Sequence, residues 1–314
     1  MIISDKDINL DEYLAAIGLE EAQEISPAEN YWHQLVARAT NGIEMQGPRL
    51  PWVKTFDTIR FPPGKLSVWA GINGHGKSQL LGQCVMWWLK DQTALIASLE
   101  MKPVETLWRM SSQWLGRAPQ VDDIDGFCKA LQGRLWIYDQ TDSVATERIL
   151  GLVHFAANEL RVDHLVIDSL TKCGLNRERY DLQAQFVDKL QWAAKRHDIH
   201  IHLVCHMRKG ESETSKPGKF DIRGAAEVTD LADNVITVWR NKPKESAIRK
   251  RRSGIMLNAS EESELRRPDS IMTVEKNREW GLEESFGLWF HQSAQQFLAM
   301  DTPHAMIWDS EVEA

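Results

Sequence analysis

The sequence predicts an α/β fold with a mostly parallel central sheet, and two observations carry this prediction. From Lys65 onward, short apolar runs alternate with helical stretches, an order typical of a parallel sheet covered on both faces. The later apolar runs have no long helices between them, so we expect the strands at that end to be antiparallel. The 314 residues, 43% of them hydrophobic, suffice for one large domain with a small appendage.

Eight strands and four long helices are expected in the compact part of the chain. We expect strands at 66–70, 94–98, 135–138, 164–167, 200–205, 235–239, 271–274 and 287–290, and helices at 79–90, 104–115, 146–160 and 182–196. The segment 241–268 is rich in charge and poor in apolar residues, which predicts an exposed, mobile loop.

The N-terminal part of the chain differs from the rest. Residues 11–22 and 28–39 have the patterns of two helices, and Pro27 separates them. We expect a helical arm at 1–49, a compact domain at 50–300 and a C-terminal tail at 301–314. The arm is either a cap on its own core or a strap that packs on a neighbouring subunit, and the sequence leaves both open.

Composition argues against several classes of protein. No apolar run is long enough to span a membrane and the N-terminus is not a signal peptide, so we expect a cytoplasmic protein without a membrane partner. The four cysteines lie far apart, which predicts reduced thiols and no zinc site. The net charge of −8 argues only weakly against nucleic-acid binding, because the local field at a site decides it.

The segment Gly71–Ser78 reads G-x-x-x-x-G-K-S and joins a predicted strand to a predicted helix, the context of a phosphate-binding loop. Its glycines let backbone N–H groups point at a phosphate, and the helix N-terminus adds partial positive charge. Lys77 would reach the β- and γ-phosphates, and Ser78 would bind Mg²⁺. We therefore expect ATP, or another NTP or dNTP, with Mg²⁺ at Gly71, Asn73, Gly74, His75, Gly76, Lys77 and Ser78.

Polar residues follow three of the predicted strands, at the sheet edge where ligands bind. Glu100 is placed to orient an attacking water, and Asp168 to support Mg²⁺. His206 would hydrogen-bond the γ-phosphate, although a lone histidine there is more often an ordinary polar residue. His200 and His202 share one strand face, where packing is favoured over a metal pair.

Two basic segments complete the pattern. The stretch 216–227 combines bases, glycines and small residues, a composition that suits either a loop against a phosphate backbone or a solvated loop. Lys276 and Arg278 lie two residues apart on one strand face, either at a solvated edge or as a pair that reaches a neighbouring subunit's nucleotide.

In the order of these motifs, the chain resembles the RecA-like helicase domain of hexameric replicative DNA helicases, the DnaB and Twinkle-like phage primase–helicase family. The resemblance runs from about residue 50 to 300. Its specific parts are Ser98-Leu99-Glu100-Met101, Asp221-Ile222-Arg223-Gly224 and the Lys276/Arg278 pair. No primase domain precedes the predicted helicase domain, so we expect a separate primase and a DNA polymerase as partners. This arrangement also suits a phage or prophage protein in a bacterial host.

The resemblance implies a hexameric ring that moves 5′ to 3′ on single-stranded DNA and unwinds duplex at a replication fork. It implies that Glu100 is the catalytic carboxylate, that Asp168 and Ser78 serve the metal, and that His206 senses the γ-phosphate. It also implies that Arg278 and Lys276 act on the neighbour's nucleotide. DNA would contact Arg208, Lys209, Lys219, Arg223 and Gly224, and the base would stack near Phe290 or His291.

Two functional alternatives to the helicase remain at this point, and the role of one basic run is also open. A RecA/RadA-type recombination ATPase would form filaments on DNA without unwinding it. A KaiC-like signalling ATPase would not need the basic loop at 216–223. Within 241–268, the run Arg249-Lys250-Arg251-Arg252 is either an extra DNA contact or a solvated surface, and we favour the second.

Overall fold

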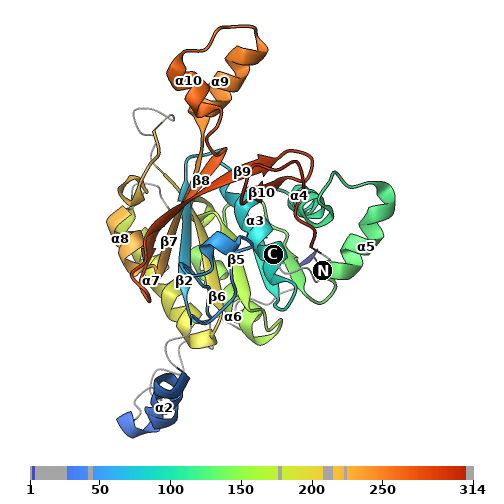
Figure 1. Ribbon diagram of the computed structural model, residues 1–314. Helices are drawn as coiled ribbons and strands as arrows, with labels where there is room; N and C mark the ends of the chain where they lie inside the picture. Colours follow the sequence, from blue (N-terminus) through green and yellow to red (C-terminus); the bar gives the residue numbers. More distant parts are fainter. Residues whose placement is uncertain are drawn as a thin grey trace.

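The computed structural model describes residues 2–3, 27–41, 45–175, 179–207, 215–222 and 225–308. These residues form a twisted sheet covered by helices on both faces (Figure 1). The strands are β1 (Ile2–Ile3), β2 (Leu66–Gly71), β3 (Ala94–Ser98), β4 (Leu135–Tyr138), β5 (His164–Asp168), β6 (His200–His206), β7 (Asn234–Arg240), β8 (Ser270–Asn277), β9 (Glu284–His291) and β10 (Gln296–Leu298). The α-helices are α2 (Trp32–Asn41), α3 (Lys77–Trp88), α4 (Pro103–Leu115), α5 (Val121–Leu131), α6 (Thr146–Asn158), α7 (Tyr180–His197), α8 (Ala225–Leu231), α9 (Lys242–Arg252) and α10 (Ala259–Glu264). Short 3-10 helices are η3 (Ala28–Tyr31), η4 (Val53–Thr55), η5 (Leu170–Lys172) and η6 (Lys219–Asp221).

The sheet confirms the predicted fold class. Its strand order is β1-β4-β3-β5-β6-β2-β7-β8-β9-β10. Neighbours from β1 to β7 pair in parallel, whereas β7 to β10 pair antiparallel. All eight expected strands are present, and the sequence does not predict β1 and β10. Because β2, β3, β5 and β6 run parallel, their carboxyl ends meet at one edge of the sheet.

Alternating side chains divide the sheet between two cores. On β6, Ile201 and Leu203 point to the core that also holds residues of α6 and α7, while Val204 points to the core beneath α3 and α4. The four predicted long helices are α3, α4, α6 and α7. Of these, α4 starts with Pro103 and ends at Gly116, whose φ of +68° suits glycine.

The segment 241–268 is a helical hairpin and not the predicted loop. Its helices α9 and α10 project from the end of the sheet next to β8 and β9 (Figure 1). Charge composition misled the prediction, because Lys, Arg and Glu are also good helix formers. Asn241 caps α9 by accepting from the Lys244 backbone N–H at 3.0 Å, and Lys250 pairs with Glu261 between the two helices. The sequence also does not predict α5 and α8.

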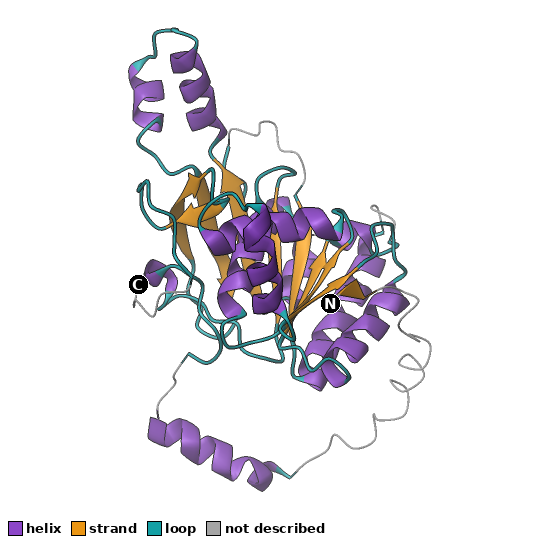
Figure 2. Cartoon of the chain, turned by 90° about the vertical axis from the view of Figure 1, so that its right-hand side faces the viewer, coloured by secondary structure: helices purple, strands orange, loops and turns teal. Residues whose placement is uncertain are grey.

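The N-terminal arm is described from residue 27 to 41, where η3 and α2 confirm the helix expected at 28–39. The helix expected at 11–22 lies outside the described residues. Both views show α2 apart from the sheet (Figures 1 and 2), with Trp32 58% and Leu35 64% exposed. At the other end of the chain, Trp308 is buried against Trp87 of α3. Among the described residues, no helix is long and apolar enough to span a membrane.

Three buried histidines pack as a layer between the sheet and α3, and two of them, His164 and His202, are hydrogen-bonded to each other. The Trp69 indole donates to His202 Nδ1 at 3.1 Å, so the proton of His202 lies on Nε2 and is donated to His164 Nδ1 at 3.0 Å. His164 Nε2 then donates to Gln92 Oε1 at 2.6 Å. His200 donates from Nδ1 to the Pro62 carbonyl at 2.6 Å.

This arrangement requires neutral imidazoles. Burial lowers the pKa of His164 and His202 well below the usual value, and that of His200 to about 4. The described residues contain no cluster of three or more metal-ligating side chains. His200 and His202 stack on each other with ring centroids 4.5 Å apart, so the packing role favoured for them agrees with the structure.

We predict that acid destabilises the fold through these histidines. Below pH about 6.5 the unfolded chain binds protons that the folded chain excludes, so the free energy of unfolding falls as the pH is lowered from 6.5 toward 4. Each histidine contributes a slope of up to about 1.4 kcal/mol per pH unit. Urea unfolding between pH 7 and pH 5 should show this slope, and His164→Gln should reduce it by about one third. An unchanged slope in the variant would contradict the assignment.

Candidate nucleotide-binding site

The phosphate loop has the backbone that the sequence motif predicts. It joins β2 to α3, with Gly74 at φ +77° and Gly76 at φ +88°. A Cβ on Gly71 would collide with the carbonyl oxygen of Val238 in the neighbouring strand, so only glycine fits there. Asn73 is exposed at the tip of the loop. His75 is buried and accepts from the Arg240 backbone N–H at 3.1 Å, which fixes the loop to the end of β7.

Lys77 is held inside the loop. Its ammonium group donates to the carbonyls of Gly71 and Ile72 at 3.0 and 3.2 Å. The same Nζ lies 3.4 Å from His206 Nδ1 at the end of β6. Burial lowers the pKa of Lys77, while the nearby Asp168 and Glu100 carboxylates oppose that effect. Polar oxygens thus surround the ammonium group, a setting in which phosphate oxygens can replace loop carbonyls.

Glu100 and His206 contact each other across the sheet edge. Because Lys77 has only donors, Nδ1 of His206 accepts and Nε2 carries the proton. Nε2 donates to Glu100 Oε1 at 2.9 Å, and the Ser169 hydroxyl donates to the same oxygen at 2.5 Å. The hydrogen bond from His206 lowers the pKa of Glu100 to about 2 against the opposing effect of burial. Glu100 is therefore an ionised carboxylate, fixed in position by two donors.

Asp168 and Ser78 provide the oxygen ligands that a small hard cation prefers. Asp168 ends β5, is buried, and accepts a hydrogen bond from Ser78 at the start of α3. Burial raises the pKa of Asp168, while the hydrogen bond from Ser78 and the charge of Lys77 oppose that effect. Because Mg²⁺ keeps several waters and binds through one or two protein oxygens plus phosphates, these two residues fit it.

A cleft of about 600 Å³ opens on the outer side of the phosphate loop. The lining residues include Gly74 and Gly76 of the loop and Phe290 of β9. His291 is engaged elsewhere, since its Nε2 donates to the Pro303 carbonyl at 3.0 Å. The cleft is also lined by Arg240 at the end of β7.

The sequence analysis missed two residues at this edge, Arg240 and Ser169. Both directly end or follow a predicted apolar strand. The strand-end rule that selected Glu100 and Asp168 would have found them.

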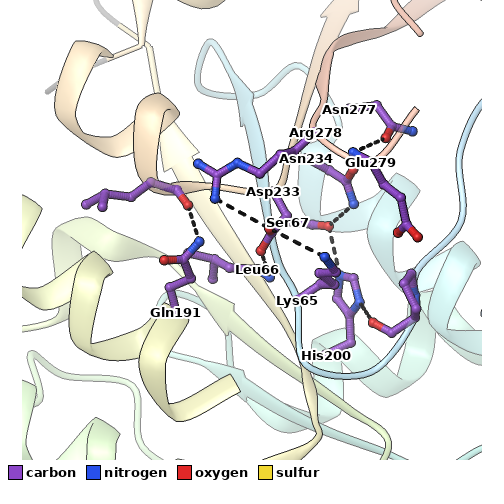
Figure 3. Close-up of polar contacts among 12 residues, drawn as sticks. Lys65, Leu66, Ser67, Gln191, His200, Asp233, Asn234, Asn277, Arg278 and Glu279 are labelled. Carbon is purple, nitrogen blue, oxygen red and sulfur yellow. Dashed lines mark hydrogen bonds and ion pairs between the residues drawn. The ribbon is translucent and has the colours of Figure 1, made fainter. Parts of the chain in front are cut away.

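Arg278 lies at the opposite edge of the sheet, near the start of β2 (Figure 3), and Lys276 pairs with Val235 at the same end of β7. Asn277 pairs with Asn234 at the start of β7, and Asn234 pairs with Ser67 near the start of β2. The seven residues of β7 span roughly 20 Å, so Arg278 is that far from the edge that carries its own phosphate loop. Arg278 binds the carbonyl of Asp230 and lies 3.6 Å from the Asp233 carboxylate.

Lys276 lies beside it and donates to the Thr229 and Asp230 carbonyls at 2.8 and 3.0 Å. Burial, followed by the charge of Arg278, lowers the pKa of Lys276. Both cations thus bind the C-terminal end of α8, where helix carbonyls favour positive charge. Neither is brought to the site formed by Lys77, Glu100 and Asp168.

Among the expected DNA-contacting residues, the structure describes only Lys219. Its ammonium group donates to Glu283 at 3.2 Å and to the Glu275 carbonyl at 3.4 Å. Arg208, Lys209, Arg223 and Gly224 lie outside the described residues. Met207 and Ile222, on the two sides of Arg208 and Lys209 in the sequence, form an antiparallel bridge. Met207 directly follows His206, so the segment between Met207 and Ile222 begins at the site.

Comparisons with known proteins agree with this geometry. A search of curated proteins finds no match. Among solved structures, the chain is similar to one described as a DnaB-like replicative helicase with its interactions with primase, at 12% identity and a TM-score of 0.64, covering 92% of this chain and 70% of that chain. It is also similar to a second solved structure, described as an ATPase domain, at 12% identity and a TM-score of 0.67, covering 88% of this chain and 100% of that chain.

These similarities confirm the recognised fold, that of DnaB-like helicase ATPase domains. A family model described as an AAA domain matches residues 34–212, more than half of the chain. The chain therefore belongs to the AAA domain family.

Proposed function

We propose that this protein is an ATP-dependent replicative DNA helicase. It would form a hexameric ring that moves 5′ to 3′ on single-stranded DNA and unwinds duplex at a replication fork. The observation that carries the proposal is the position of His206. Its side chain lies 3.4 Å from Lys77 Nζ and donates a hydrogen bond to Glu100. Along the chain, His206 is followed by Met207, which pairs with Ile222, and by the residues at 208–224 that are expected to contact DNA. A change at the nucleotide then has a physical route to a DNA-binding loop.

Hydrolysis of ATP, or of another NTP or dNTP, would use the phosphate loop and the adjacent strand ends. The loop N–H groups and Lys77 would hold the phosphates, and Glu100 would orient the attacking water. Ser78 and Asp168 would hold Mg²⁺, which when bound neutralises charge on the β- and γ-phosphates. The His206–Glu100 hydrogen bond would respond to loss of the γ-phosphate, because His206 also lies 3.4 Å from Lys77, the residue proposed to hold that phosphate.

The site would be completed by a second subunit. Lys276 and Arg278 cannot reach their own phosphate loop across the sheet, so any action on a nucleotide must be on a neighbour's. There Arg278 would stabilise the charge that develops on the γ-phosphate during hydrolysis. The hydrogen bonds of Arg278 to the end of α8 would hold it ready in the isolated subunit.

Assembly and partners follow from the same proposal. The exposed apolar side chains of α2 support the strap interpretation, in which the arm at 1–49 would pack on an adjacent subunit. A motor domain at 50–300 and a short tail at 301–314 would follow it. DNA would pass Arg208, Lys209, Lys219, Arg223 and Gly224 in the centre of the ring. Primase and DNA polymerase would be separate proteins in a bacterial cytoplasm, with a phage or prophage as the source.

We predict that the protein displaces a strand from a forked duplex with a 5′ single-stranded tail, in the presence of Mg²⁺ and ATP. Lys77→Ala should abolish both displacement and hydrolysis, because the phosphates lose their charged partner. Lys90→Ala is the matched control, since Lys90 is exposed beyond the far end of α3 and should leave both activities unchanged. Hydrolysis without displacement would favour a recombination ATPase that forms filaments, and turnover in Lys77→Ala would contradict the phosphate-loop assignment.

We further predict that two inactive variants restore each other when mixed. Arg278→Ala should bind nucleotide but lose most turnover, and so should Glu100→Ala. In a mixed ring, an intact Glu100 from one subunit can meet an intact Arg278 from the next, so hydrolysis should recover. The control is Lys77→Ala mixed with Glu100→Ala, which leaves every interface with a defective phosphate site. Failure of the first mixture to exceed the control would argue against action between subunits.

A further inference from the structure

The α9–α10 hairpin forms a wall of the cleft beside the phosphate loop. The same cleft is lined by Gly74 and Gly76 of the loop and by Ile248, Arg249 and Arg252 of α9. The hairpin is inserted between β7 and β8, and Figure 1 shows both helices projecting beyond the end of the sheet. An inserted element thus faces the part of the molecule expected to hold a nucleotide.

One face of α9 points into this cleft. The residues of α9 that line it are Glu245, Ile248, Arg249 and Arg252. Their spacing of three, four and seven residues places them on a single helix face. Arg251 belongs to the same basic run but does not line the cleft, so only Arg249 and Arg252 of this run are placed to contact a ligand there.

Several contacts fix the hairpin to the body of the protein. The Asn241 backbone N–H donates to the Asp269 carbonyl at 2.8 Å, which closes the base of the hairpin. Lys244 is buried and binds the Asp269 carboxylate at 2.8 Å and the Arg267 carbonyl at 2.7 Å. Ala247 is also buried. These contacts hold the cleft-facing side of α9 in a defined orientation.

The cleft holds positive charge that its own acids do not neutralise. Glu245 forms ion pairs with Arg240 and Lys242, and Asp269 pairs with Lys244. Within the described ranges, Arg249 and Arg252 form no ion pair, and both are exposed. Two guanidinium-bearing side chains therefore line the same cleft as the glycines of the phosphate loop. Guanidinium groups bind phosphate oxygens strongly and often through two hydrogen bonds.

We infer that Arg249 and Arg252 of the inserted hairpin bind the phosphates of the nucleotide held by the same subunit. The inference rests on the proposed nucleotide site and adds a second wall of ligands to it. Lys77 and the loop N–H groups would hold the phosphates from the side of the sheet, and the two arginines from the solvent side. Within the run at 249–252, Arg249 and Arg252 would bind the nucleotide, whereas Arg251 does not line the cleft.

The test is nucleotide binding by the full chain carrying Arg249→Ala and Arg252→Ala together. Energy transfer from tryptophan to an N-methylanthraniloyl ADP reports binding, and displacement by inorganic tripolyphosphate reports affinity for phosphates without a nucleoside. Loss of charged hydrogen bonds should weaken both ligands about tenfold. Arg251→Ala removes one charge of the same run from a position that does not line the cleft, and it should change either affinity less than about twofold.

Two outcomes would overturn the inference. Unchanged binding of both ligands in the double variant would contradict the inference. The run would then be a DNA contact if binding of a labelled single-stranded oligonucleotide became weaker, and a solvated surface if it did not. Weaker binding of the ADP analogue with unchanged tripolyphosphate binding would indicate that the arginines contact the nucleoside and not the phosphates. Binding by the unaltered chain, and its loss in Lys77→Ala, tests the nucleotide site itself, so failure of the two proposals is distinguishable.

Discussion

The hydrogen bond between His206 and Glu100 depends on the parallel pairing of the central strands, and the rest of the site depends on that bond. Parallel pairing of β2, β3, β5 and β6 brings their carboxyl ends to one edge, so residues far apart in sequence become neighbours. His206 lies between Lys77 and Glu100 and contacts both. Its tautomer follows from the ammonium group on one side, and the ionised state of Glu100 follows from the proton on the other.

The sheet also separates two sets of charges that the proposed reaction needs together. One edge carries the phosphate loop and its carboxylates, and the other edge carries Lys276 and Arg278. Because strands are stiff, no rearrangement of loops brings the two edges of one subunit together. Each isolated subunit therefore carries only part of the proposed site. Catalysis would require neighbouring copies to assemble, with the sheet edge that carries Arg278 of one copy against the phosphate-loop edge of the next.

The parts that the sequence predicts well are those where pattern and local chemistry agree. The eight strands are apolar runs between turn signals, and the phosphate loop has glycines where the backbone needs positive φ at Gly74 and Gly76. The hairpin at 241–268 is the clearest failure, because a highly charged segment has no apolar pattern and its helices depend on the Asn241 cap and the Lys250–Glu261 pair. Arg240 and Ser169 are accessible to sequence reasoning in principle, since each ends or directly follows a predicted strand at the same edge as Glu100 and Asp168. The place of Arg278 across the sheet, by contrast, follows only from the antiparallel pairing of β7 and β8.

The most direct test of the account is the rate of ATP hydrolysis with and without single-stranded DNA, in the unaltered protein and in His206→Ala. The account predicts strong stimulation of the unaltered protein by DNA, because His206 joins the nucleotide site to the basic segment. It predicts that His206→Ala keeps nucleotide binding and loses the stimulation. An equal hydrolysis rate with and without DNA in the unaltered protein would contradict the claim that His206 couples the nucleotide site to DNA. Stimulation by DNA that persists in His206→Ala would contradict it as well.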